Sequence, residues 1–365
     1  MKVALIQDWF VVNGGAEKVF REFVNIFPDA DVFGLVDFLD EKDRSDILNG
    51  KKVKTTWIQK IPNARNSFRN YLVFFPHAIR SLDLSGYDLI ISSSYAVAKG
   101  IRKRKGQVHI CYCHSPVRYA WDLRQAYLSR LSGLKRMVAG LMLDHIAQWD
   151  LKTIGEVDHF IANSKNVAER IKRIYNRDST VIYPPVDIIG FTPCHEKEDY
   201  YFTSLRVVPY KRLDLIVDAF RLMPDKKLVV SGDGPALAKI QASAPANVQF
   251  LGFISKKDLV SRMQKAKAFV LAAEEDFGIT SLEAQSCLTP VIALKRGGYL
   301  ETVVENKTGV FFNEQTASSI RDAIIDFEAM DKPFEETDFT KNVESFSTER
   351  FRNTISNFIR QHAHA

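Results

Sequence analysis

A chain of 365 residues is longer than one typical domain, so two domains of ordinary size are expected. Its 46% hydrophobic and 26% charged residues are those of a globular protein, which excludes extended disorder. No run approaches the roughly eighteen apolar residues of a spanning helix, and four cysteines without paired spacing favour a reducing cytosol. The net charge of +6 suits an anionic partner, either nucleic acid or an acidic membrane surface.

Short apolar runs alternate with amphipathic stretches along the whole chain, beginning with MKVALIQD, which predicts a first strand rather than a signal peptide. In the first half we expect strands at KVALIQD, DVFGLVD, DLIISSS, QVHICYC, DHFIANS and STVIYPP. In the second half we expect them at YYFTSL, KLVVSGDGP, VQFLGF, AFVLAAE, PVIAL and GVFF. This alternation predicts an α/β protein with parallel sheets covered by helices on both faces.

The alternation pauses at Pro184 to Asp187 and again over the polar residues 193–199, which predicts a linker there. We therefore expect two Rossmann-like domains that face a cleft, over residues 1–185 and 186–345. Residues 346–365 form an amphipathic helix, begun by Ser347 or Thr348, that we expect to pack back on the first domain.

The first loop ends in Gly14-Gly15 directly before the helical stretch AEKVFREFVNIF. Glycine at a helix N-terminus lets the backbone approach a ligand, although a tight turn explains the pair equally well. The pattern is not G-x-G-x-x-G and no acidic residue follows at the dinucleotide spacing, so nicotinamide binding is not expected.

Residues 51–80 hold Trp57, Phe68, Tyr71, Phe74 and Phe75 among basic side chains. Aromatic side chains with a basic rim are typical of a segment that lies on a membrane. The alternative is a helix that packs its aromatic side chains into the domain core.

The group Cys111-Tyr112-Cys113-His114 ends one of the expected strands. A strand sends the two cysteines to one face and His114 to the other. Since no second ligand pair exists, we expect no metal site.

The second half opens with SLRVVPYKRLDLIVDAF, in which Arg206 and Lys211 lie between a strand and a helix. Cations at the carboxyl end of a parallel strand lie where open α/β sheets bind ligands, and they would neutralise a diphosphate. The alternative is an exposed helix start. Two breaks follow later strands, at Gly232 in SGDGP and at Gly252-Phe253.

The stretch AAEEDFGITSLEAQS, residues 272–286, joins an apolar strand to a helix through an acidic turn. Backbone N–H groups of Gly278, Ile279 and Thr280 would form an anion site at the helix N-terminus. Glu275 and Glu283 would flank that site, which suits a phosphorylated ligand with hydroxyls, such as a sugar nucleotide. The alternative is a capping box, Thr280-x-x-Glu283, with a purely structural role.

The ordered motifs LRVVPYKRLD, SGDGP, FLGF, EEDFGITSLEA and ANSKNVAERI…VIYPPVD resemble family 4 of the retaining glycosyltransferases, which have the two-domain GT-B fold. CYCHSPVRYAWD further resembles bacterial mannosyltransferases that use GDP-mannose in O-antigen or exopolysaccharide synthesis. The sequence departs from the family at Leu205, where glycine is frequent, and at Asp276, where many members have glycine.

By this resemblance, Glu275 bonds donor-sugar hydroxyls and Glu283 holds the nucleotide ribose, while Arg206 and Lys211 clamp the diphosphate. His114 lies near the anomeric carbon and joins Glu275 as a catalytic residue. The remaining positions are expected to bind the donor: Gly14, Gly15, Gly232, Phe253, Phe277, Gly278, Ile279 and Thr280. The first domain would carry the acceptor and the second the nucleotide-sugar donor.

The expected activity is therefore that of a hexosyltransferase which moves a sugar, mannose from GDP-mannose, to a lipid-linked oligosaccharide. The charge that develops on the leaving phosphate would be stabilised by the two cations and the helix N-terminus, so no metal or cofactor is expected. The enzyme would be cytoplasmic and associated with the inner face of the membrane. Alternatives are a UDP-sugar donor, a GT-B sugar-nucleotide epimerase and a non-catalytic nucleotide-sugar-binding scaffold; nucleic-acid binding is poorly supported.

Overall fold

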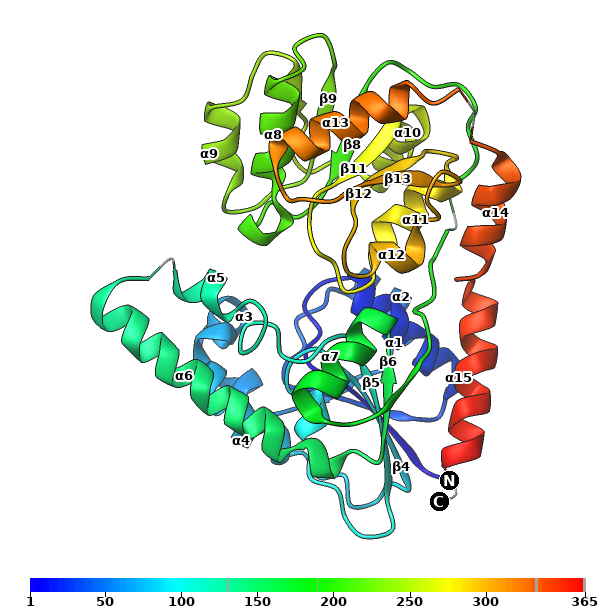
Figure 1. The fold of residues 1–365 in the computed structure, drawn as a ribbon. Coiled ribbons are helices and arrows are strands. Elements are labelled where there is room, and N and C mark those ends of the chain that lie inside the picture. Colours follow the sequence, from blue (N-terminus) through cyan, green and yellow to red (C-terminus); the bar gives the residue numbers. More distant parts are fainter. Residues whose placement is uncertain (130, 189, 332–333, 364–365) are drawn as a thin grey trace. The chain divides into compact units, whose positions relative to one another are not determined.

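The computed structural model describes residues 1–129, 131–188, 190–331 and 334–363. The chain divides into two compact units, which are described separately (Figure 1). Unit 1 comprises Met1–Pro185 together with Thr348–Ala365, and unit 2 comprises Val186–Ser347.

Unit 1 is built on a seven-stranded parallel sheet in the order β3-β2-β1-β4-β5-β6-β7. Leu5 of β1, an interior strand, lies opposite Val32 on one side and Ile91 on the other. The strands are β1 (Val3–Gln7), β2 (Asp31–Gly34), β3 (Val53–Thr55), β4 (Leu89–Ser94), β5 (Val108–Cys113), β6 (His159–Ala162) and β7 (Ser179–Val181). All six strands expected in this half form, and β3 is an addition that the sequence analysis missed.

The helices of unit 1 connect these strands and cover the sheet. Short 3-10 turns lie at η1 (Trp57–Lys60), η2 (Phe68–Phe74), η3 (Ala98–Gly100) and η4 (Ile154–Glu156). The helices are α1 (Gly15–Ile26), α2 (Glu41–Leu48), α3 (Ala64–Ser67), α4 (Phe75–Arg80), α5 (Arg124–Leu128), α6 (Gly133–Lys152), α7 (Lys165–Tyr175) and α15 (Thr348–His362). Local sequence sets their limits: α7 begins where the Ser164 hydroxyl accepts from the Val167 N–H and ends at left-handed Asn176.

Unit 2 is built on a six-stranded parallel sheet in the order β10-β9-β8-β11-β12-β13. The strands are β8 (Tyr201–Ser204), β9 (Leu228–Ser231), β10 (Val248–Phe250), β11 (Ala268–Leu271), β12 (Val291–Leu294) and β13 (Gly309–Phe312). The helical elements are η5 (Pro209–Lys211), α8 (Leu213–Arg221), α9 (Leu237–Ala242), α10 (Lys256–Lys265), α11 (Ile279–Ser286), α12 (Tyr299–Thr302), α13 (Ala317–Glu328) and α14 (Glu336–Glu344). The predicted fold class, two parallel-sheet α/β domains, is confirmed.

Helix α15 belongs to unit 1 although unit 2 precedes it in the chain. Phe351, Ile355 and Phe358 are buried in the same hydrophobic core as β1 and α1. The Phe351 ring lies 6.0 Å from the Phe23 ring, and Arg352 Nε donates to the buried Glu22 carboxylate at 2.5 Å. The last helix therefore completes the core of unit 1.

The aromatic segment 51–80 folds as β3, η1, α3, η2 and α4. Phe68 and Phe75 are fully buried, so the core-packing alternative is correct for them. Trp57 and Phe74 remain 39% and 54% exposed, with their rings 6.3 Å apart. Among the described helices, none is long and apolar enough to cross a bilayer.

Candidate active site

The carboxyl edge of the unit 2 sheet is shaped by glycines that allow neighbouring loops to touch. The backbone N–H groups of Leu205 and Val207 donate to the carbonyls of Ser231 and Asp233. A Cβ on Gly232 would lie 1.8 Å from the Leu205 carbonyl oxygen, and one on Gly234 would lie 2.3 Å from that of Val207. The loop after β8 thus continues beside the loop after β9, and Leu205 is accommodated although it replaces a glycine that is frequent in the family.

This packing presents the two predicted cations at the sheet edge. Arg206 is exposed and lies between the two backbone contacts that Leu205 and Val207 make. Lys211 ends η5 and forms an ion pair with Glu275, whose carboxylate comes from the loop after β11. The side chains of Lys211 and Glu275 are 23% and 16% exposed, so the pair is accessible to a ligand. The structure therefore brings together two predicted residues that lie 64 positions apart.

Helix α11 starts beside this ion pair. Gly278 is its N-cap residue with φ of 91°, and no side chain caps the helix. Because the helix begins at Ile279, Thr280 is not the N-cap and the capping-box alternative is wrong. No described residue accepts a hydrogen bond from the N–H groups of Gly278, Ile279 or Thr280. The first turn of α11 can therefore bind an anion through these N–H groups.

Glu283 lies one turn further along α11 and is 8% exposed. A carboxylate with so little exposure needs a polar partner or a ligand, since burial disfavours its charge. Phe277 is buried as well, with its ring 5.5 Å from that of Phe346, so it offers the site its backbone only. Phe253, by contrast, is 87% exposed after β10.

Two further glycines, missed in the sequence analysis, support the acidic turn. The Gly298 N–H donates to the Glu275 carbonyl at 2.8 Å. A Cβ on Gly297 would lie 2.4 Å from that carbonyl oxygen, and one on Gly298 would lie 2.3 Å from the Phe277 Cα. The signal was present as two adjacent glycines two residues after the strand PVIAL.

In unit 1, Asp8 ties together the loops that follow β1 and β4. Its buried carboxylate accepts four backbone N–H bonds of 2.6–3.0 Å, from the consecutive residues 95–98. Burial nevertheless raises the Asp8 pKa to about 6, with the four hydrogen bonds opposing it. Asp8 was missed because a single acidic residue at a strand end has no distinctive spacing.

The Gly14-Gly15 loop is held by another buried carboxylate. Glu17 Oε2 accepts from the Gly14 N–H at 3.2 Å, and Glu17 Oε1 accepts from Gln7 Nε2 at 3.2 Å. Burial raises the Glu17 pKa to about 7. Gly14 is the N-cap of α1, so the tight-turn alternative describes its local role without excluding a ligand.

His114 directly follows β5 at the same edge of the unit 1 sheet. Its Nε2 lies 2.8 Å from the Ser93 hydroxyl, and its ring is 6.1 Å from that of Tyr95. Burial of the imidazole lowers its pKa to about 3, so it is neutral at physiological pH. The ring is therefore held by a side-chain hydroxyl.

Each unit thus offers a distinct chemical environment. The predicted residues of unit 1 are Gly14, Gly15 and His114, where a neutral imidazole can exchange hydrogen bonds with a hydroxyl group. Unit 2 carries the cations, the helix N-terminus and both predicted glutamates at one sheet edge, which can hold a phosphorylated ligand and stabilise negative charge. The ten predicted residues of unit 2 are Arg206, Lys211, Gly232, Phe253, Glu275, Phe277, Gly278, Ile279, Thr280 and Glu283.

Solved structures resemble this chain over nearly all of its length. Anabaena HepE in complex with UDP has a TM-score of 0.70 and 17% identity, with 99% of this chain and 100% of that chain covered. Sucrose-phosphate synthase from Thermosynechococcus elongatus has a TM-score of 0.71 and 17% identity, with 99% of each chain covered. At these identities the likeness shows the fold.

Curated relatives match shorter segments. A D-inositol 3-phosphate glycosyltransferase of Mycobacterium avium (strain 104) is 28% identical over 225 residues, 52% of this chain and 53% of the relative. A GDP-mannose-dependent monoacylated alpha-(1-6)-phosphatidylinositol monomannoside mannosyltransferase of Corynebacterium glutamicum is 29% identical over 215 residues, 50% of this chain and 56% of the relative. The matches thus span about half the length of these relatives.

Two family models together match the chain from residue 13 to residue 345. The model described as Glycosyltransferase Family 4 matches residues 13–188, and the model described as Glycosyl transferases group 1 matches residues 188–345. The chain is therefore similar to glycosyltransferases in both of its units, and a different glycosyltransferase family model matches each half of the sequence.

Proposed function

We propose that this protein is a retaining hexosyltransferase that moves mannose from GDP-mannose to a lipid-linked oligosaccharide during synthesis of a bacterial surface polysaccharide. The main support for this proposal is the ion pair of Lys211 and Glu275 beside the first turn of α11. Within unit 2, the pair places a cation that can bind a diphosphate next to a carboxylate that can accept hydrogen bonds from sugar hydroxyls. The inner face of the cytoplasmic membrane is the proposed location, because the acceptor is lipid-linked.

The proposed residues have separate roles. Arg206, Lys211 and the N–H groups of residues 278–280 bind the diphosphate, and Glu283 binds the ribose. Glu275 holds the donor sugar, while His114, being neutral, orients a hydroxyl near the anomeric carbon. Gly14 and Gly15 admit the diphosphate to the backbone of the first loop, and Gly232 and Phe253 border the nucleotide.

The reaction needs no group beyond donor and acceptor. The bond from the anomeric carbon to the β-phosphate oxygen breaks, and its electron pair leaves with the nucleoside diphosphate. The acceptor oxygen bonds to the same face of the anomeric carbon, and its proton goes to the departing phosphate. Arg206 and Lys211 stabilise the charge on that phosphate, so the proposed reaction uses no divalent metal and should continue in EDTA.

Mannose and guanosine are supported by the Corynebacterium relative, whose name specifies GDP-mannose. A UDP-sugar is the second candidate donor, since Anabaena HepE was solved with UDP and with UDP-glucose. The sheet-edge residues of unit 2 recognise the diphosphate, which both donors share.

Donor choice is tested by thermal unfolding with a panel of GDP- and UDP-sugars. A ligand present at about a hundred times its Kd stabilises the native state by roughly 2.7 kcal/mol, which raises Tm by about 5–11 °C for units of this size. GDP-mannose should give this shift and UDP-sugars should not; the reverse result would assign a UDP-sugar.

Product analysis then separates the classes of activity. A transferase releases nucleoside diphosphate when a lipid-linked acceptor extract is added and leaves the donor sugar unchanged without it. An epimerase converts the donor sugar without an acceptor. Binding of the donor with neither reaction would identify a scaffold.

A further inference from the structure

Helix α6 exposes a row of large apolar side chains on the outside of unit 1. Leu134, Met137, Val138 and Leu141 are 70%, 59%, 45% and 64% exposed. Their spacing places them on one face of the helix. Figure 1 shows α6 as a long helix along the margin of unit 1, beside α5.

The C-terminal half of α6 already fixes the helix to unit 1. Leu143, Ile146 and Trp149 are buried, and Ile146 lies in a cluster with Val117 and Ala120. The exposed face is therefore not needed to hold the helix in place. Exposed apolar side chains gathered in this way mark a surface that another partner covers.

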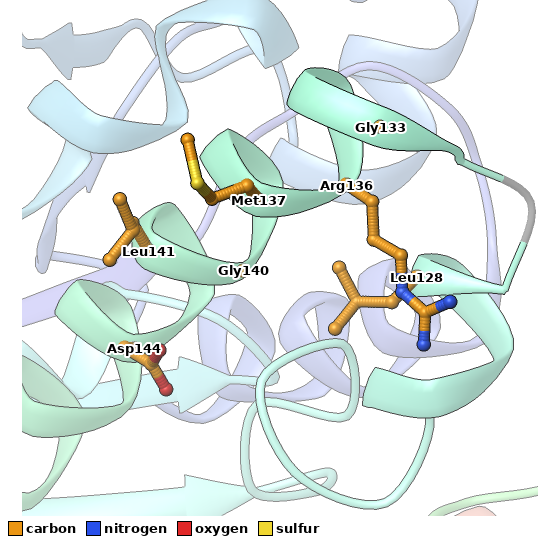
Figure 2. Close-up of a pocket in the computed structure, with 7 residues that line it drawn as sticks. All are labelled: Leu128, Gly133, Arg136, Met137, Gly140, Leu141 and Asp144. Atoms are coloured by element: carbon orange, nitrogen blue, oxygen red, sulfur yellow. The ribbon is translucent and has the colours of Figure 1, made fainter.

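A pocket of ≈ 420 Å³ lies between this face and α5. Leu128 of α5 and Met137 and Leu141 of α6 contribute its apolar lining. Figure 2 shows Arg136 reaching alongside Leu128 at one end, so an apolar hollow and a cation adjoin each other. We name the apolar row, Lys135, Arg136 and this pocket together the α6 face.

The charge on the α6 face is positive. Lys135 and Arg136 are exposed, and neither forms an ion pair with a residue that the structure describes. The acidic residue of the pocket, Asp144, is paired with Arg124 at 2.8 Å. The cations consequently remain available to an anionic partner.

We propose that the α6 face is a docking surface for an anionic lipid bilayer. Leu134, Met137 and Leu141 enter the boundary between headgroups and acyl chains, while Lys135 and Arg136 contact the phosphates. A second copy of this chain fits less well, since a two-fold interface through this face would bring two sets of unpaired cations together. The docking surface rests on the proposed lipid-linked acceptor for its purpose, but its binding is measured without catalysis.

The test uses the full chain and sedimentation with phosphatidylcholine vesicles that contain about one-third phosphatidylglycerol, against phosphatidylcholine alone. Wild type should prefer the anionic vesicles, and salt should weaken the preference. Lys135→Gln/Arg136→Gln should lower the partition coefficient about thirtyfold, since each basic side chain near a surface contributes roughly 1 kcal/mol. Leu134→Ser/Leu141→Ser should lower it at least about tenfold.

Matched controls come from unit 2. Lys239→Gln/Lys257→Gln removes two exposed cations, and Leu222→Ser/Ile325→Ser removes two exposed apolar side chains. Both controls should partition like wild type. If the α6 variants also partition like wild type, the docking surface is refuted. A wild-type dimer that Leu134→Ser/Leu141→Ser converts to monomer would assign the face to a second copy and overturn the proposal.

Donor-induced thermal shifts on the same variants separate this inference from the proposed function. The α6 variants should keep the shift, because neither changes a donor-binding residue. If the donor raises the Tm of wild type but wild type does not sediment with anionic vesicles, only the docking surface is overturned. Wild type that binds vesicles but responds to no sugar nucleotide overturns only the proposed function.

Discussion

Removing the charge of Glu275 should have an effect on nucleotide binding opposite to that of removing the charge of Glu283. Lys211 is paired with Glu275, so a diphosphate must compete with that carboxylate for the cation. An ion pair of this accessibility contributes about 0.5–1 kcal/mol. Glu275→Gln releases Lys211 and should therefore tighten binding of free GDP about two- to fivefold.

The same substitution should lower turnover of the intact donor, because Glu275 is proposed to hold the sugar. Glu283→Gln should instead weaken the binding of both GDP and the intact donor. A charged hydrogen bond to ribose contributes roughly 1.5–3 kcal/mol, which corresponds to about ten- to a hundredfold in affinity.

Calorimetric titration of both variants with GDP and with the donor measures these differences. Lys211→Met provides the control, since it should weaken GDP binding whether or not Glu275 is present. Loss of GDP affinity in Glu275→Gln by tenfold or more would refute the reasoning, because Glu275 would then contact the nucleotide rather than restrain the lysine.

Three further predictions follow from the candidate site and its supports. Arg206→Ala and Lys211→Ala should each reduce turnover by at least about a hundredfold in steady-state assays, as loss of transition-state charge stabilisation does; near-normal rates would contradict the clamp. Gly278→Ala should lower the free energy of unfolding by about 2–5 kcal/mol in urea titrations, because it combines a positive φ with a Cβ only 2.6 Å from the Tyr299 ring. Gly140→Ala, in an open part of a helix, is its control and should be neutral or stabilising. Glu17 should make unfolding pH-dependent: its folded pKa of about 7 exceeds the ordinary 4.5, so its contribution to stability is complete below pH 4.5 and falls as pH rises to 7. Relative to Glu17→Gln, wild type should lose roughly 3 kcal/mol between pH 4.5 and pH 8, and parallel curves for the two would contradict the raised pKa.

The sheets could be predicted because each strand is a short, continuous apolar run between turn residues. The exception, β3, has only three residues and includes a lysine, so it lacks that pattern. The helix α14 was missed for a related reason, because residues 336–344 alternate polar side chains with only Phe339 and Val343 buried.

The candidate site was only partly readable from the sequence. Residues that follow strands directly, such as Arg206 and Glu275, could be assigned to one sheet edge by topology alone. The ion pair between Lys211 and Glu275, and the carboxylate of Asp8 beneath four consecutive N–H groups, depend on contacts between distant loops. No local pattern encodes such contacts.

The exposure of α6 was hidden for a different reason. Apolar residues surround much of this helix, so its sequence does not distinguish the face that packs on unit 1 from the face that remains exposed. Residues 51–80 presented the same ambiguity, and the structure divided them, with Phe68 and Phe75 in the core and Trp57 and Phe74 outside.

The return of α15 to unit 1 has a consequence for the order in which the protein folds during synthesis. Domains usually fold as the ribosome releases them, beginning with the N-terminal one. Here unit 2 is one continuous segment, whereas the core of unit 1 lacks Phe351, Ile355 and Phe358 until α15 emerges. Unit 2 can therefore finish folding while the earlier-made unit is still incomplete, and a nascent chain stalled before Thr348 should hold a native second unit beside an unfinished first one.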